Sequence, residues 1–163
     1  SLMIALGLDR HAFSQFSSLR IHLEISFWDD AVRKLLETDK ALLLQLVEQA
    51  QEKLGSHNDR IEIPHPEHRA FHLTIYGRLE NPFVLGLLEA YWDGYEAVAL
   101  NTYADYSYLQ AVWNYHGQIA AAISEGDYGT GKRLLTEHMQ LLDQMGIARE
   151  LAIHAYPIQG EEL

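Results

Sequence analysis

The stretch HGQIAAAISEGD, residues 116–127, decides how this chain folds. Its apolar residues recur at helical spacing, and Gly126 followed by Asp127 predicts a helix end and then the cap of a new helix. So short a connection makes the two helices antiparallel neighbours. His116 lies ten residues before Gly126, and His138 lies eleven after Asp127. At a rise of about 1.5 Å per residue, both are expected roughly 15 Å from the turn and at the same height.

The rest of the chain is also predicted to be helical. Apolar residues recur at three- and four-residue steps, and no segment alternates with a period of two. The expected helices cover residues 10–37, 38–54, 66–79, 82–102, 106–125 and 128–154. Thr38 or Asp39 is the expected cap of the second helix, and Asn81 that of the fourth. We therefore predict an all-α fold, an antiparallel bundle of about six to seven helices with no sheet.

The composition limits the possible functions. The chain has 163 residues, 48% of them apolar, which suffices for one domain with a core. It has no cysteine, which excludes disulfides and thiolate metal sites. Its net charge of −11 argues against a nucleic-acid surface, since phosphate binding needs clustered Lys and Arg. No signal peptide or membrane span is recognised, so we expect a cytoplasmic protein that does not contact the membrane.

Four histidines fall on the apolar faces of these helices. His68 and His72 are four residues apart and share a face with Phe71 and Ile75. His116 and His138 face each other across the predicted hairpin. A buried histidine needs a partner, so either each has its own hydrogen bond or the four converge on one metal. We favour a metal site formed by His68, His72, His116 and His138. The other five histidines are given no role.

The order of motifs resembles the FCD domain, the effector-binding C-terminal domain of FadR-type regulators in the GntR superfamily. The family's opening R-x-x-x-E is matched by LRIHLE at 19–24. Its D-x-x-F-H followed by Asn is matched by HRAFH at 68–72 and by Asn81. Its two later histidines are matched by His116, which precedes the glycine–aspartate turn, and by His138. The resemblance covers about residues 12–150.

The resemblance also implies ligands. In members that hold a metal, an Asp and three histidines bind it, and His68 stands here at the position of the Asp. An all-nitrogen set favours Zn²⁺ as the cofactor, with Ni²⁺ also possible. The alternative is that His68 has left the coordination sphere. The implied effector is a small organic acid or sugar acid. Arg20 is expected to bind its carboxylate, the alternative being an ion pair with Glu24. Trp92 and Tyr95 are expected to line the pocket, unless they are only core residues.

The resemblance further suggests a domain arrangement. We expect a linker or a remnant of cloning at 1–11, the FCD-like domain at 12–155, and a C-terminal tail at 156–163. The winged helix-turn-helix domain that precedes FCD domains in the family is not recognisable in this sequence. DNA would therefore be bound only through a domain absent from this chain. We expect the chain to be an excised C-terminal domain rather than a stand-alone sensor, and to form a homodimer.

Taken together, the sequence predicts the effector-sensing domain of a bacterial transcription regulator and not an enzyme. Two alternatives remain open at this point. One is a zinc-dependent hydrolase on a helical bundle, since three histidines and a water are a hydrolytic arrangement. The other is a metal-free structural module in which the histidines are satisfied by each other and by Tyr108 or Tyr115.

Overall fold

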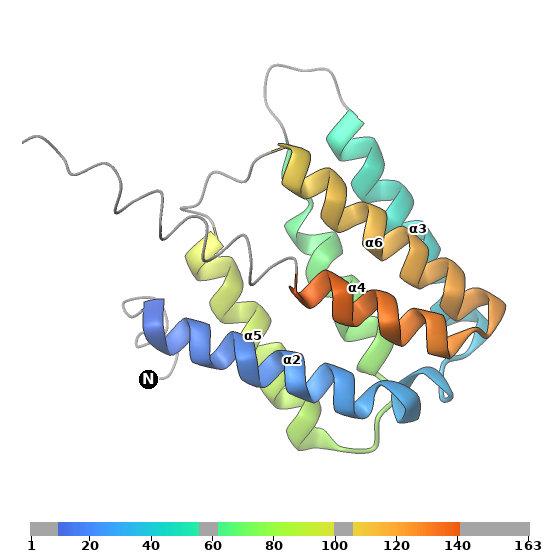
Figure 1. Ribbon diagram of the computed structural model, residues 1–163, viewed down its shortest axis with the longest axis horizontal. Helices are drawn as coiled ribbons and strands as arrows, with labels where there is room; N and C mark the ends of the chain where they lie inside the picture. Colours follow the sequence, from blue (N-terminus) through green and yellow to red (C-terminus); the bar gives the residue numbers. More distant parts are fainter. Residues whose placement is uncertain (1–9, 56–61, 100–105, 141–163) are drawn as a thin grey trace, which may run out of the picture.

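The computed structural model describes residues 10–55, 62–99 and 106–140, and this part of the chain is helical without a strand. The helices are α2 (Arg10–Val32), α3 (Glu37–Gly55), α4 (His65–Tyr76), α5 (Pro82–Ala99), α6 (Tyr106–Glu125) and a last helix over residues 128–140. Figure 1 shows their arrangement. The predicted all-α fold is confirmed.

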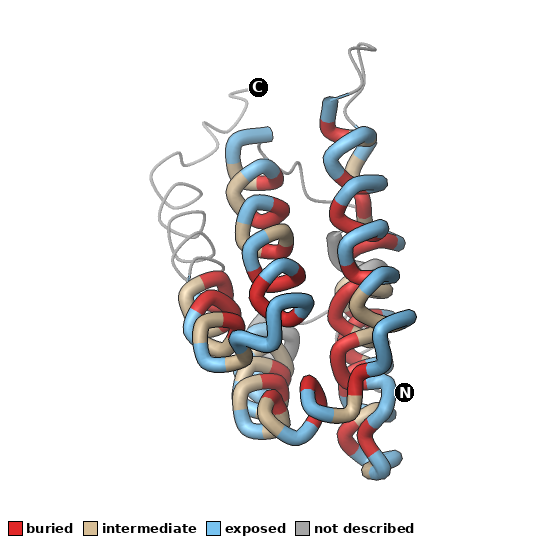
Figure 2. The backbone as a smooth tube through the Cα atoms, turned by 90° about the vertical axis from the view of Figure 1, so that its right-hand side faces the viewer, coloured by how far each residue is buried: buried red, intermediate tan, exposed pale blue. Residues whose placement is uncertain are grey.

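The short helix α4 lies at the centre of the bundle. It packs against α2, α3 and α5, while α3 also packs along α6 (Figure 1). The buried sides of the helices face one another and the exposed sides face outward (Figure 2). One charged residue, Arg20, is among the largest fully buried side chains, beside Trp28, Trp92 and Trp113. The core therefore contains a cation, which needs a partner there.

The hairpin between α6 and the last helix forms as predicted. Gly126 has φ 76°, a left-handed conformation that glycine adopts without strain. Asp127 then caps the last helix, because its Oδ1 accepts a hydrogen bond from the backbone N–H of Thr130 at 3.1 Å. The turn fixes the register of the two helices, and with it the relative heights of His116 and His138.

A tryptophan fastens the last helix to α2. The indole N–H of Trp28 donates to the backbone oxygen of Tyr128 at 2.9 Å. Gly131 lies directly against the Trp28 ring, since a Cβ at this position would be 2.7 Å from Cζ2. Trp28 is fully buried, so this close approach brings the start of the last helix onto α2.

Several helix ends differ from the prediction. The first helix ends at Val32, not at residue 37, and a turn over 33–36 follows. Leu35 in this turn is buried, so the apolar spacing continued beyond the helix. Asp39 is not a cap before α3 but lies in its first turn, where its Oδ2 accepts from the N–H of Leu36 at 2.8 Å.

The remaining helix ends lie closer to their predicted positions. Helix α4 begins one residue before Pro66 and ends at Tyr76, three residues short of the predicted end. Asn81 caps α5 as predicted, accepting from the N–H groups of Phe83 and Val84 at 3.1 and 3.3 Å. The predicted helical residues 100–102 and 141–154 fall outside the described part of the chain. So does nearly all of the predicted segments 1–11 and 156–163.

Within the described residues, no helix combines the length and the apolar character that crossing a bilayer requires.

Candidate metal centre

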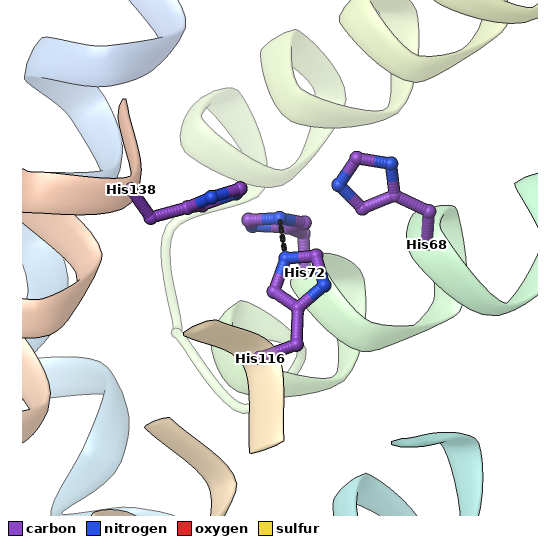
Figure 3. Close-up of side chains that lie close together, drawn as sticks. All are labelled: His68, His72, His116 and His138. Atoms are coloured by element: carbon purple, nitrogen blue, oxygen red, sulfur yellow. Dashed lines mark hydrogen bonds between the residues drawn. The ribbon is translucent and has the colours of Figure 1, made fainter. Parts of the chain in front are cut away.

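Three helices bring the four histidines together. His68 and His72 project from the same face of α4, His116 comes from α6 and His138 from the last helix (Figure 3). One ring nitrogen from each can be chosen so that all four lie within 4.8 Å of one another. The side chains are buried, His68 to 7% exposure and the other three completely. The sequence thus correctly predicted which histidines converge.

The rings lie close enough to share one ion. Nε2 of His72 is 3.2 Å from Nε2 of His116, as the dashed line in Figure 3 marks. The ring centroid of His116 is 4.8 Å from that of His68 and 4.7 Å from that of His138. Nitrogen ligands about 2.0–2.1 Å from one tetrahedral zinc ion stand roughly 3.3 Å apart, close to the Nε2–Nε2 distance of His72 and His116.

Several imidazole nitrogens in this cluster have no hydrogen-bond partner within the described residues. These buried, unpaired atoms are Nε2 of His68, Nδ1 of His116 and both ring nitrogens of His138. Buried polar atoms in native proteins are nearly always paired, because an unpaired one costs about 1–3 kcal/mol. Each of these three rings therefore has a ring nitrogen that a metal ion could use. The donor set therefore fits a divalent metal.

The histidines are also in the protonation state that binds metals. Burial lowers the pKa of His68, His116 and His138 well below the ordinary value, and the neighbouring histidines lower it further. Burial also lowers the pKa of His72, although the charge of Glu24 opposes the effect. All four rings are therefore neutral at pH 7, and a neutral imidazole has the lone pair that a metal needs.

A buried ion pair supports the cluster from α2. Arg20 donates from Nε to Oε1 of Glu24 at 2.7 Å, and both side chains are buried. Burial alone would raise the pKa of Glu24, but Arg20 and His72 outweigh it and lower the pKa to about 2. Burial would likewise lower the pKa of Arg20, but Glu24 and Tyr91 raise it. Both groups therefore stay charged in the core.

Glu24 also fixes the orientation of His72. Its Oε2 lies 2.9 Å from Nδ1 of His72. An ionised carboxylate only accepts hydrogen bonds, so the proton of the neutral ring sits on Nδ1 and the lone pair on Nε2 points to the other histidines. The hydroxyl of Tyr76 on α4 donates to the backbone oxygen of Glu24 at 2.7 Å, which ties α4 to α2 at this point.

The sequence did not identify Glu24 as a site residue. It was considered only as an ion-pair partner for Arg20, four residues away on the same helix. The pair does form, but a contact to a histidine 48 residues further along the chain could not be seen from spacing. What the sequence does show is that Arg20 and Glu24 lie on a helix face that is otherwise apolar.

The residues predicted to bind an acid also lie at the cluster. Arg20 Nη1 donates to the hydroxyl of Tyr91 at 3.4 Å, and Nη2 is 3.3 Å from both ring nitrogens of His72. The buried ring of Trp92 has its centroid 5.0 Å from that of His72 and 4.7 Å from that of His68. Tyr95 is only partly buried and lies against His68 at 5.9 Å.

The acids next to the histidines in sequence face elsewhere. Glu67 pairs with Lys53 at 2.9 Å, and Asp127 caps the last helix. Glu137 pairs with Arg133 at 2.7 Å. Among these three, none supplies a general base to the cluster, which weakens the hydrolase alternative.

Comparisons with known proteins agree with this geometry. The model of the FCD domain matches residues 15–141. Among solved structures, E. coli McbR/YncC is similar, with a TM-score of 0.69 and 23% sequence identity over 88% of this chain and 67% of that chain. At this identity the likeness shows the fold alone. A search of curated proteins finds no match.

Proposed function

The chain belongs to the FCD domain family, and from this premise we propose that it is the effector-sensing domain of a GntR-type transcription regulator. We propose that His68, His72, His116 and His138 hold one divalent metal and that a small carboxylic acid binds beside it. The observation that carries the proposal is that four buried histidines each offer one ring nitrogen within 4.8 Å of the others. Three of them, His68, His116 and His138, also have buried ring nitrogens without a hydrogen-bond partner among the described residues.

The ligand set indicates which metal fits. Four neutral imidazoles suit Zn²⁺ or Ni²⁺ better than Mg²⁺ or Ca²⁺, which prefer oxygen. When bound, the metal supplies a positive charge and a coordination position for an oxygen of the acid. Its ligands contribute no negative charge because all four are imidazoles, and the carboxylate of Glu24, which contacts His72, is paired with Arg20. The loaded centre therefore favours an anion.

Arg20 is the second candidate contact for the acid. A guanidinium has five N–H donors, and in the described residues Nε contacts Glu24, Nη1 contacts Tyr91 and Nη2 contacts the ring of His72. Nη1 has one contact in this part of the chain for its two N–H groups, so the proposal assigns its second N–H to a carboxylate oxygen. We propose that Arg20 contributes to acid binding in this way while it keeps Glu24 ionised.

Regulation requires that the acid bind two states of the bundle unequally. The four histidines lie on α4, α6 and the last helix, and Arg20 and Glu24 add α2. An acid bound there would therefore contact helices from the beginning and from the end of the described sequence. We propose that this shifts how the domain presents an attached DNA-binding domain, and that the regulator acts as a homodimer. A hydrolase remains the weaker candidate, because the carboxylate nearest the histidines is held by Arg20.

The proposal predicts metal-dependent stabilisation by acids. Zinc should raise the midpoint of thermal unfolding of chelator-treated protein. Saturating lactate, succinate or glucuronate should add roughly 5–10 °C for the acid that fits, the shift expected at a concentration of about 100 times Kd. A thermal shift assay with and without zinc measures both effects. An acid that stabilises the metal-free protein just as well contradicts a metal-assisted site.

A further inference from the structure

Trp92 carries an unpaired donor that a metal cannot satisfy. Its indole Nε1 is buried and has no hydrogen-bond partner among the described residues, and the side chain is 0% exposed. An indole nitrogen carries a proton and no available lone pair, so it donates and never ligates. A metal held by the four histidines would take one lone pair from each ring, whereas the N–H of Trp92 would remain buried without an acceptor.

The Trp92 ring is held firmly at the centre. It stacks on His72 at an interplanar angle of 29° and makes a T-shaped contact with His68. The guanidinium carbon of Arg20 lies 4.8 Å from the ring centroid. Tyr95 packs on it with centroids 5.2 Å apart. A ring fixed on several sides presents its N–H in one direction, at little entropic cost on binding.

A second tryptophan provides a comparison. Trp113 also packs against the cluster, with its ring 4.7 Å from that of His116 and 6.0 Å from that of His68. Its indole nitrogen is not among the buried unpaired atoms of the described residues. Aromatic packing around the histidines is thus shared by both tryptophans, whereas the unpaired donor belongs to Trp92.

We propose that Trp92 is a specificity residue, whose indole N–H donates a hydrogen bond to an oxygen of the acid at the four-histidine centre. The inference rests on the proposed function and deepens it. A positive centre and a buried donor are both satisfied by an anionic oxygen, and a cation or a ligand without an acceptor satisfies neither. The ligand class is therefore an oxyanion, which a carboxylate supplies.

The test replaces each tryptophan by phenylalanine. Co²⁺-loaded protein is titrated with acetate, lactate and succinate, and the change in the visible absorption of the cobalt reports acid binding. Trp92→Phe should weaken the tightest of these acids by about tenfold or more, the loss of one charge-assisted hydrogen bond, and should leave the Co²⁺ stoichiometry unchanged. Trp113→Phe should change acid affinity less than threefold.

Each other outcome is decisive. Equal acid affinity in Trp92→Phe and the wild type overturns the inference while the metal site stands. Wild-type protein that loads cobalt but binds none of the three acids overturns it as well. Failure of the wild type to bind cobalt overturns the proposed function and the inference together. If Trp92→Phe does not fold or load metal, 3-benzothienylalanine at position 92 keeps the bicyclic ring and removes only the N–H, and the same tenfold loss is expected.

Discussion

Replacing Glu24 with alanine should destabilise the domain by about 3–5 kcal/mol. The substitution leaves the guanidinium of Arg20, which is 1% exposed, without its counter-ion in the core. It also removes the acceptor that holds Nδ1 of His72. Removing one member of a buried pair costs far more than the pair itself contributes, because the remaining charge stays desolvated. Urea unfolding of the metal-free protein measures the difference.

The chain offers a matched control for this substitution. Arg133 and Glu137 form the same kind of pair, four residues apart and 2.7 Å between nitrogen and oxygen, but their side chains are 60% and 40% exposed. Glu137→Ala should therefore change the free energy of unfolding by no more than about 1 kcal/mol. Equal effects at the two positions would show that burial of the Arg20–Glu24 pair has no energetic consequence.

The role of Glu24 toward the metal is separable from its role in stability. Glu24→Gln keeps the shape of the side chain but replaces a charged acceptor by a neutral amide. Mutating a residue that hydrogen-bonds to a metal-binding histidine typically lowers metal affinity by about 10- to 100-fold. We expect Glu24→Gln to lower zinc affinity within that range. Zinc affinity by competition with a chromophoric chelator gives the comparison.

The metal-free domain should lose stability steeply below pH 6.5. Burial lowers the pKa of His68, His116 and His138 well below the ordinary value in the folded state. Above pH 6.5 both the folded and the unfolded chain leave these rings neutral, so they cause no pH dependence. Below it the unfolded chain binds protons that the folded chain does not, which favours unfolding. Each ring contributes about 1.4 kcal/mol per pH unit, so three give roughly 4 kcal/mol per unit.

Glu24 adds a second loss at lower pH. Its folded pKa of about 2 lies below the unfolded value, so the stability it provides is present above pH 4.5 and disappears as the pH falls toward 2. As the pH falls, the stability lost through the histidines is lost before the stability lost through Glu24. Urea unfolding of chelator-treated protein at pH 7.5, 6.5 and 5.5 measures the histidine loss, and further points at about pH 4 and 3 measure the Glu24 loss.

Two variants check the assignment to buried histidines. His138→Leu removes one fully buried ring, so the slope below pH 6.5 should fall by about 1.4 kcal/mol per pH unit. His22→Gln removes an exposed histidine of α2 and should leave the slope unchanged. An equal slope in wild type, His138→Leu and His22→Gln would mean that other groups govern the acid sensitivity.

The parts of the fold that depend on local signals could be predicted from the sequence. Gly126 and Asp127 act through backbone conformation and a cap within one turn, and they set the register of the hairpin. That register places His138 beside His116. The end of the first helix was wrong because Leu35 continues the apolar spacing through a turn that is not helical.

The parts of the site that depend on packing between distant segments could not be predicted. Glu24 reaches His72 across 48 residues, and only the packing of α2 on α4 brings them together. The sequence also could not distinguish Trp92 from Trp113, since both read as aromatic core residues. Their difference is that the indole nitrogen of Trp92 is buried without a partner among the described residues and that of Trp113 is not among such atoms, and this depends on the whole surroundings of each ring.

The central claim is that four buried histidines hold one metal ion. Elemental mass spectrometry of tag-free protein, purified without added metal, tests it most directly beside a His72→Ala/His116→Ala double variant. The account predicts about one zinc or nickel ion per chain in the wild type and none in the variant. Wild-type protein without metal, even after reconstitution with zinc or nickel, would contradict it and leave Arg20 alone to hold an acid.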